Sequence, residues 1–219
     1  MKLEVAIQNA YQKLKNNCIK SALLDSELLL AETIQQSREF VILNSNYNIS
    51  KTEYQTFCDM IAQRSKGKPV AYLTKKKIFW KNEFFINEKV LIPRPDTELI
   101  IELVLDIYKN KNKINFLDIG LGSGCILLSI LKERKDFIGT GIDISPHALK
   151  VCKINAYKLG LKNKIKLFKS DIDKFSFGKY DLIISNPPYI KNADLKYLER
   201  DVVNFEPKLA LDGGIDGIS

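Results

Sequence analysis

An apolar run from Tyr180 to Ile184 leads into the sequence Asn186-Pro187-Pro188-Tyr189. Two consecutive prolines supply no N–H groups for a strand ladder, so the chain must leave a sheet at this point. The residue before each proline is pushed towards extended geometry, which fixes the outward direction of the carbonyls of Asn186 and Pro187. A side-chain amide, rigid carbonyl acceptors and an aromatic ring suit a planar –NH2 group. We therefore predict a reaction centre here that acts on an amino or amide nitrogen.

A glycine-rich turn, Asp118-Ile119-Gly120-Leu121-Gly122-Ser123-Gly124, lies between a predicted strand and a predicted helix. Glycines let the backbone approach a ligand closely, and the free N–H groups of a helix start favour an anionic or carboxylate group. A dinucleotide fingerprint would need Gly or Ala at position 125 or 127, where this chain has Cys125 and Leu127. The G-x-G-x-G spacing instead resembles the nucleoside-binding loop of S-adenosylmethionine (SAM) methyltransferases.

Two acidic residues follow the next predicted strands. Asp143 stands about 20 residues after the glycine-rich turn, which is the distance at which an acid reaches ribose hydroxyls in parallel sheets. Its alternative role is to cap the helix that begins near Pro146, and we favour the ribose role. Asp171, followed by Ile172, ends the third strand where an adenine would lie. A solvated loop carboxylate is an almost equally good interpretation of Asp171.

These residues need elements to position them. Helical spacing of apolar residues predicts helices over about 3–14, 21–35 and 37–43, and Ser50-Lys51-Thr52-Glu53 matches a capping box that opens a helix through Arg64. No cluster in this first part carries chemistry, so partner recognition or scaffolding is its expected role. A β-like pattern over 78–92, ending in Val90-Leu91-Ile92, predicts a hairpin linker. Asp96 or Thr97 is predicted to cap the helix that follows.

The second half alternates strand and helix, which is typical of a parallel sheet. We expect strands over 114–119, 137–142, 165–168 and 180–185, and helices over 123–132 and 145–159.

Composition narrows the function classes further. The chain has 219 residues, 45% of them hydrophobic, and a net charge of +8. Scattered lysines and few arginines give no clear nucleic-acid face, and no segment is apolar enough to span a membrane. Four widely spaced cysteines form no C-x-x-C pair, which favours free thiols over a zinc site. His147 is the single histidine, so neither a Ser-His-Asp set nor a metal cluster is expected.

Together these motifs resemble the PrmC/HemK family, the N5-glutamine methyltransferases of peptide-chain release factors. The resemblance spans essentially the whole chain, and four features carry it: Leu91-Ile92-Pro93-Arg94-Pro95-Asp96-Thr97-Glu98, the turn from Leu117 to Gly124, Ser185-Asn186-Pro187-Pro188-Tyr189-Ile190, and Phe205-Glu206-Pro207 followed by Leu209-Ala210-Leu211-Asp212-Gly213-Gly214.

The resemblance implies an α/β fold: a Rossmann-like class I SAM-dependent methyltransferase domain over 94–219, preceded by a helical substrate-docking domain over 1–74 and a β-hairpin linker over 75–93. Family members continue beyond the point where this chain stops, so a truncated domain with an incomplete sheet is expected.

The implied activity is transfer of a methyl group from SAM to the glutamine amide in the Gly-Gly-Gln motif of class 1 release factors, in the cytoplasm. The family pattern makes Asn186, Pro187 and Tyr189 catalytic. Substrate binding falls to Asn186, Pro187, Pro188 and Tyr189, and SAM binding to Asp118, Gly120, Leu121, Gly122, Ser123, Gly124, Asp143, Asp171, Ile172 and Asn186.

Two alternatives stay open. A nucleic-acid methyltransferase acting on adenine or guanine would meet the same –NH2 donors, but would need a flipped base and a recognition module that the sequence does not show. A truncated, non-catalytic docking module is the other. No direct nucleic-acid or membrane partner and no metal are expected.

Overall fold

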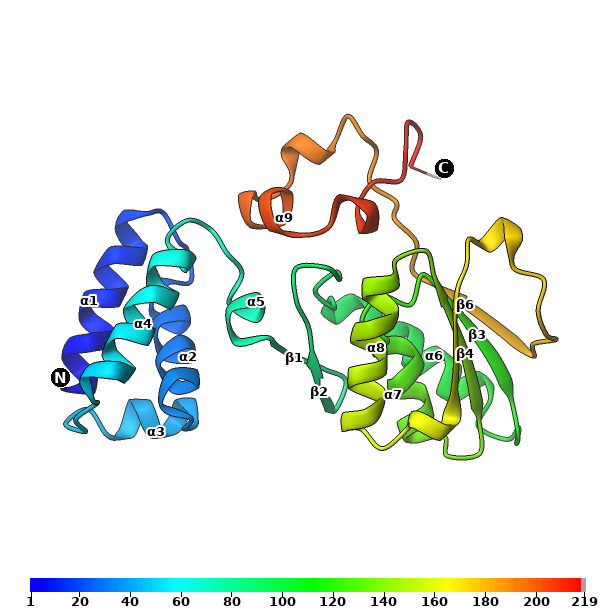
Figure 1. Ribbon diagram of the computed structural model, residues 1–219, viewed down its shortest axis with the longest axis horizontal. Coiled ribbons are helices and arrows are strands. Elements are labelled where there is room, and N and C mark those ends of the chain that lie inside the picture. Colours follow the sequence, from blue (N-terminus) through cyan, green and yellow to red (C-terminus); the bar gives the residue numbers. More distant parts are fainter. Residues whose placement is uncertain (218–219) are drawn as a thin grey trace. The chain divides into compact units, whose positions relative to one another are not determined.

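The computed structural model describes residues 1–217, and the chain folds into two compact units. The first, here called the helical unit, comprises Met1–Thr74 together with Glu199–Phe205. The second, the α/β unit, comprises Lys75–Leu198 and the described residues 206–217. Figure 1 labels the helices and strands of both units.

The helical unit is built around apolar side chains that its helices turn towards one another. Leu14, Leu30 and Phe57 come from three different helices, and each is no more than 1% exposed. The predicted capping box is confirmed, because the Ser50 side chain accepts from the Glu53 N–H and the Glu53 side chain accepts from the Ser50 N–H. The helices are α1 (Leu3–Asn16), α2 (Ala22–Ile34), α3 (Arg38–Leu43), α4 (Lys51–Arg64), α5 (Val70–Thr74) and α9 (Arg200–Phe205).

The α/β unit contains a four-stranded parallel sheet in the order β5-β4-β3-β6. Its main helices lie together on one side of the sheet, where they bury an apolar face (Figure 1). The alternation of strand and helix predicted from the sequence is confirmed. The elements are β3 (Asn115–Ile119), β4 (Ile138–Asp143), β5 (Ile165–Lys169), β6 (Leu182–Ser185), α6 (Glu98–Ile107), α7 (Cys125–Glu133) and α8 (Pro146–Lys158).

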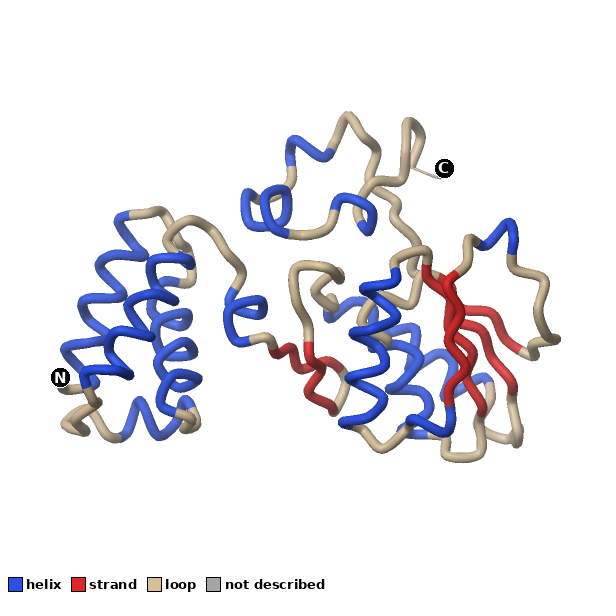
Figure 2. The backbone as a smooth tube through the Cα atoms, in the orientation of Figure 1, coloured by secondary structure: helices blue, strands red, loops and turns tan. Residues whose placement is uncertain are grey.

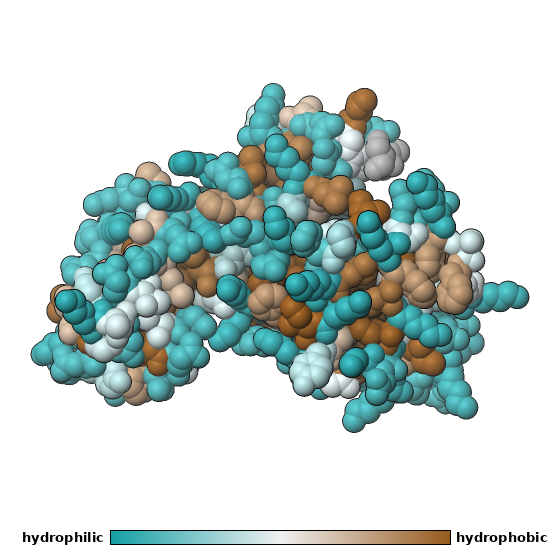
Figure 3. Space-filling model, viewed as in Figure 1, coloured by the Kyte–Doolittle hydropathy of each residue, from teal (hydrophilic) through white to brown (hydrophobic). Residues whose placement is uncertain are grey.

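The other side of the sheet carries no helix layer in the part of the chain that the structure describes (Figure 2). Ile183 on β6 is accordingly 60% exposed. In the view of Figure 3, hydrophobic side chains gather over the α/β unit, whereas the helical unit presents mostly hydrophilic ones.

The linker forms an antiparallel hairpin of β1 (Lys76–Phe79) and β2 (Asn82–Phe85), as predicted. The β-like pattern at Val90–Ile92 is wrong as a strand prediction, because this stretch is irregular and the Ile92 N–H donates to a side chain, that of Glu206. The short helix α5 was not predicted. Within residues 1–217 there is no helix with the length and apolar character that crossing a membrane requires.

Candidate active site

The carboxyl ends of three neighbouring strands meet at one edge of the sheet. Residue pairing sets Ile119 of β3 opposite Ile142 of β4 on one side and opposite Ser185 of β6 on the other. Ser185 also donates a side-chain hydrogen bond to the carbonyl of Ile119, at 3.1 Å. The loops that follow these strands therefore leave the sheet side by side, and they carry the glycine-rich turn, Asp143 and Asn186.

The glycine-rich turn has a backbone that side chains would disrupt. Gly120, Gly122 and Gly124 all have positive φ, a conformation that residues with a Cβ rarely adopt. At Gly124 an added Cβ would lie 2.5 Å from the sulfur of Cys152 on α8, so the turn also needs glycine for packing. This close approach presses the start of α7 against α8.

Asp143, at the end of β4, holds this turn in place. Its carboxylate accepts from the Gly122 N–H at 3.0 Å and from the Ser145 N–H at 2.8 Å. Capping of α8 is instead done by Ser145, whose side chain accepts from the Ala148 N–H. The pKa of Asp143 is raised, because burial outweighs the two N–H donors that lower it.

Asp118, at the end of β3, is 1% exposed, and neither of its carboxylate oxygens has a hydrogen-bond partner among the described residues. Burial raises its pKa to about 7, and the negative charge of Asp143 adds to the effect, while the nearby N–H of Leu127 offsets only part of it. A buried carboxyl group without a hydrogen-bond donor lowers the stability of the folded protein unless a ligand supplies a donor. This arrangement fits a ligand that carries a cationic amino group, as SAM does.

Asn186 follows β6 directly and is half-buried. Its side-chain N–H donates to the hydroxyl of Thr97 at 3.4 Å, which leaves its carbonyl oxygen available as an acceptor. Of the two residues predicted to cap α6, Thr97 occupies the N-cap position as expected, but its side chain makes no cap hydrogen bond. The Thr97 hydroxyl meets Asn186 instead.

Beyond Asn186 the loop is open to a partner molecule. Pro187 and Tyr189 are exposed, Tyr189 by 69%, and Pro188 is half-buried. The next residue, Ile190, pairs in parallel with Asp212 through an isolated bridge, and the Gly213 N–H donates to its carbonyl at 2.9 Å. The loop is therefore fixed at both ends while its tip stays accessible.

Asp171 and Ile172 are exposed residues after β5. Asp171 accepts from the Asp173 N–H at 3.3 Å, and the neighbouring Ser170 N–H donates to the carbonyl of Asp143 at 3.2 Å. The second contact ties this loop to the end of β4. The residues predicted for the adenine thus follow the strand next to the one that carries Asp143.

Three residues of the site were not identified from the sequence. Thr97 orients Asn186, and Glu206 binds Arg94 and the Ile92 N–H. Asn155 of α8 is 1% exposed and binds both the Ser123 carbonyl and the β2 backbone. Each acts across a long sequence separation. Thr97 and Glu206 lie within quoted motifs, whereas nothing in the sequence pointed to Asn155.

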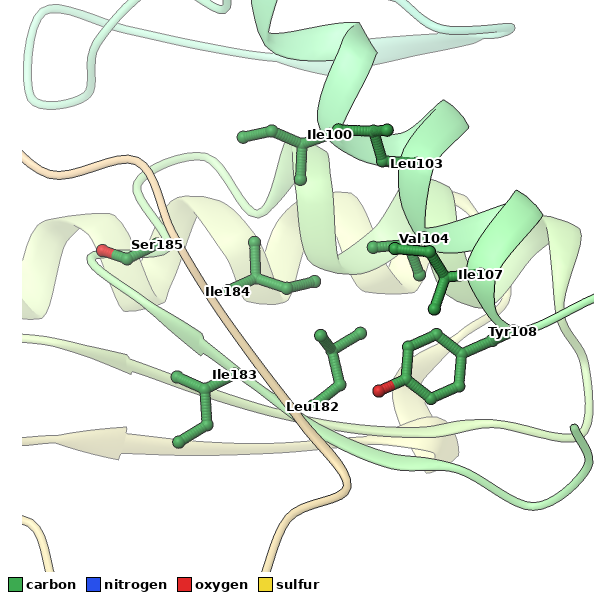
Figure 4. Close-up of a pocket in the computed structure, with 9 residues that line it drawn as sticks. All are labelled: Ile100, Leu103, Val104, Ile107, Tyr108, Leu182, Ile183, Ile184 and Ser185. Atoms are coloured by element: carbon green, nitrogen blue, oxygen red, sulfur yellow. The ribbon is translucent and has the colours of Figure 1, made fainter.

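A separate apolar hollow of about 270 Å³ lies between α6 and the edge strand β6 (Figure 4). Its lining is aliphatic apart from Tyr108 and Ser185 and includes no charged side chain. The residues that line it are Ile100, Leu103, Val104, Ile107, Tyr108, Leu182, Ile183, Ile184 and Ser185.

Comparison with known proteins bears on both units. Residues 5–74 match the family model described as PrmC N-terminal domain, and residues 97–205 match the Methyltransferase small domain. A protein of Clostridium acetobutylicum named Release factor glutamine methyltransferase is 38% identical over 100% of this chain and 78% of its own length. One of Leptospira interrogans with the same name is 42% identical over 94% of this chain and 73% of its own.

A solved SAM-dependent methyltransferase from Geobacter sulfurreducens is 24% identical over 42% of this chain and 36% of its own, with a TM-score of 0.36.

The parallel sheet, the glycine-rich turn and the acid on the next strand, with the methyltransferase family model over the same residues, define a class I SAM-dependent methyltransferase. At 38% identity over its whole length, the chain belongs to the release factor glutamine methyltransferase family.

Proposed function

We propose that this protein transfers a methyl group from SAM to the side-chain amide nitrogen of the glutamine in the Gly-Gly-Gln motif of class 1 release factors. The observation that carries the proposal is the position of Asn186. It follows β6, next to the strand that leads into the glycine-rich turn, and its amide N–H is already engaged by Thr97. Its carbonyl oxygen therefore remains for an –NH2 group of the substrate.

SAM would be held by the backbone of Gly120–Gly124, by Asp118 for its amino group and by Asp143 for its ribose. Asp171 and Ile172 are the candidates for contact with the adenine. When bound, SAM supplies an electrophilic methyl group on a positively charged sulfur. Asp118 and Asp143 then place carboxylates near a cation, which favours binding of the cofactor.

An amide nitrogen is a poor nucleophile because its lone pair is delocalised into the carbonyl group. The side-chain carbonyl of Asn186 and the backbone carbonyl of Pro187 would each accept one N–H of the glutamine, which orients the nitrogen. The same acceptors would stabilise the positive charge that develops on nitrogen as its bond to the methyl carbon forms and the sulfur–methyl bond of SAM breaks, which leaves S-adenosylhomocysteine. No strong base is needed, because the nitrogen proton becomes acidic only as the methyl group arrives, and it then passes to solvent. Tyr189 would pack on the flat amide.

The helical unit is proposed to dock the release factor, since a glutamine side chain alone cannot select one protein among many. Its helices carry no chemistry-bearing cluster, and residues 5–74 match the PrmC N-terminal domain model. We place this activity in the cytoplasm, where translation ends.

The test is incubation of the full chain with methyl-labelled SAM and, in separate reactions, a class 1 release factor or DNA. Label on the glutamine of the Gly-Gly-Gln motif, absent when this glutamine is replaced by alanine, is the expected result. Label on DNA alone would support a nucleic-acid methyltransferase instead. Binding of the release factor without transfer would indicate a docking module.

A further inference from the structure

The segment Glu199–Phe205, here called the α9 segment, packs with the helical unit although the residues on both sides of it belong to the α/β unit. It also follows the Asn186–Tyr189 loop closely in sequence. The helical unit thus contains a piece of chain whose two covalent neighbours lie in the unit that carries the proposed reaction centre.

The helical unit holds this segment through a buried arginine. Arg64, at the end of α4, is 7% exposed and donates to Asp25 at 2.7 Å and to Asp201 at 2.6 Å. Burial works against its charge, but the two carboxylates more than compensate and raise its pKa. Asp25 alone would balance the charge of Arg64. The second, charge-assisted bond, to Asp201, therefore attaches the α9 segment to the helical unit.

Close to Arg64 in the chain, Gly67 leaves the space that the α9 segment occupies. Gly67 has a φ of +99°, and a Cβ added there would lie 3.1 Å from the Asp201 carboxylate and 3.5 Å from the ring of Phe205. A side chain at position 67 would therefore push against both ends of α9.

The residue that follows the α9 segment is fixed in the α/β unit. Glu206 is 6% exposed; one carboxylate oxygen accepts from Arg94 at 2.6 Å and the other from the Ile92 N–H at 3.2 Å. Arg94 is followed by the rigid Pro95 and then by Thr97, which contacts Asn186. A short run of bonded residues thus leads from Glu206 to the proposed reaction centre.

We propose that Asp201 is a positioning residue for methyl transfer, a proposal that rests on the function proposed above. Its ion pair with Arg64 lets the helical unit hold the α9 segment. Because Glu206 directly follows the α9 segment, holding that segment also restrains Glu206. The contacts of Glu206 with Arg94 and Ile92 then restrain Thr97, which orients Asn186. The binding of SAM does not depend on this series of contacts from Asp201 to Asn186.

The test compares Asp201→Asn with Glu199→Gln in the full chain. Asp201→Asn removes one charge from a partly exposed side chain and leaves the buried Arg64–Asp25 pair intact. Glu199→Gln is the matched control, because it removes an exposed ion pair with Lys20 from the same segment. Three quantities are measured: hydrogen exchange at the Ile92 amide, kcat on the release factor, and the dissociation constant of SAM.

For Asp201→Asn we expect exchange at Ile92 to accelerate about tenfold and kcat to fall about tenfold, with SAM affinity within about twofold of wild type. Glu199→Gln should match wild type in all three, and Asp201→Glu should recover part of the rate. Unchanged exchange at Ile92, an equal loss in Glu199→Gln, or a parallel loss of SAM affinity would overturn the proposal. If the wild-type chain methylates no release factor, the proposed function fails, and exchange at Ile92 alone decides the coupling.

Discussion

At the scale of single residues, the protonation state of Asp118 is expected to be coupled to the binding of SAM. Its carboxyl group lies at the end of β3 without a hydrogen-bond donor, and burial raises its pKa to about 7. Near neutral pH the group is therefore partly protonated before a ligand binds. A cationic ligand favours the ionised form, so we expect SAM to bind more tightly as the pH rises through 7.

The same residue makes folding stability depend on pH. In the unfolded chain Asp118 has an ordinary pKa of 3.8, so between pH 4 and 7 the folded state binds the extra proton. The stabilising contribution is complete below pH 3.8 and is lost as the pH rises to 7, by at most about 4 kcal/mol. Denaturant unfolding at pH 4.5 and 7.5 should show this loss in wild type and not in Asp118→Asn. Equal pH slopes in the two proteins would contradict it.

Thr97 provides a second test at residue scale. Thr97→Val removes the hydroxyl that accepts from Asn186, so the amide of Asn186 loses its fixed orientation. Because a neutral hydrogen bond contributes about 1 kcal/mol, we expect kcat to fall about fivefold with unchanged SAM affinity. Thr97→Ser, which keeps the hydroxyl, is the control and should retain most of the rate. If the kcat of Thr97→Val equals that of wild type, the hydrogen bond between Thr97 and Asn186 does not contribute to methyl transfer.

Individual residue roles were predictable from the sequence only where the partner is close in the chain or belongs to a motif. Ser50 and Glu53 are three residues apart, and their capping box is confirmed. Thr97 was assigned to the helix beside it, but its partner Asn186 stands 89 residues away. Arg64 and Glu206 also have distant partners, 39 and 137 residues away for Arg64 and 112 and 114 residues away for Glu206, and the local pattern does not predict these contacts.

Among the elements, α8 carries more of the site than its pattern suggested. The side-chain amide of Asn155, buried in α8, pairs with both backbone polar groups of Phe85 on β2. It accepts from the Phe85 N–H at 2.7 Å and donates to the Phe85 carbonyl at 2.9 Å. It also donates to the carbonyl of Ser123, at 2.9 Å. One side chain therefore fastens both the hairpin and the glycine-rich turn to the same helix.

We expect Asn155→Leu to lower the free energy of unfolding by about 3 kcal/mol, because it leaves buried backbone groups of Phe85 and Ser123 without partners. Lys153→Ala, an exposed change on the same helix, should alter it by less than about 0.5 kcal/mol. Urea denaturation of the two variants measures both values. If the free energy of unfolding falls no more for Asn155→Leu than for Lys153→Ala, Asn155 does not stabilise the attachment of the hairpin and the turn to α8.

The sequence predicted elements well where the periodic pattern was long. The alternating strands and helices of the second half are confirmed, whereas Val90–Ile92 reads as a strand and is not one. A strand needs a neighbour to pair with, and there the Ile92 N–H binds the Glu206 side chain instead. Short elements such as α5 are set by tertiary packing, which no local pattern records.

At the scale of the whole molecule, the chain combines a helical unit and an α/β unit that match two different family models. The α/β unit carries the residues proposed to bind SAM and the proposed reaction centre. The helical unit is proposed to bring the protein substrate. The central claim is that Asn186 acts on the substrate amide while the glycine-rich turn, Asp118 and Asp143 act on SAM.

The most direct test of this claim is to measure methyl transfer and SAM binding separately in Asn186→Ala. We expect the rate of transfer to the release-factor glutamine to fall about 100-fold, since the acceptor that orients the nitrogen is gone, while the dissociation constant of SAM changes far less than the rate. Asn110→Ala, an exposed asparagine after α6, should leave both unchanged. Loss of SAM binding in Asn186→Ala with normal turnover of the bound cofactor would contradict the account.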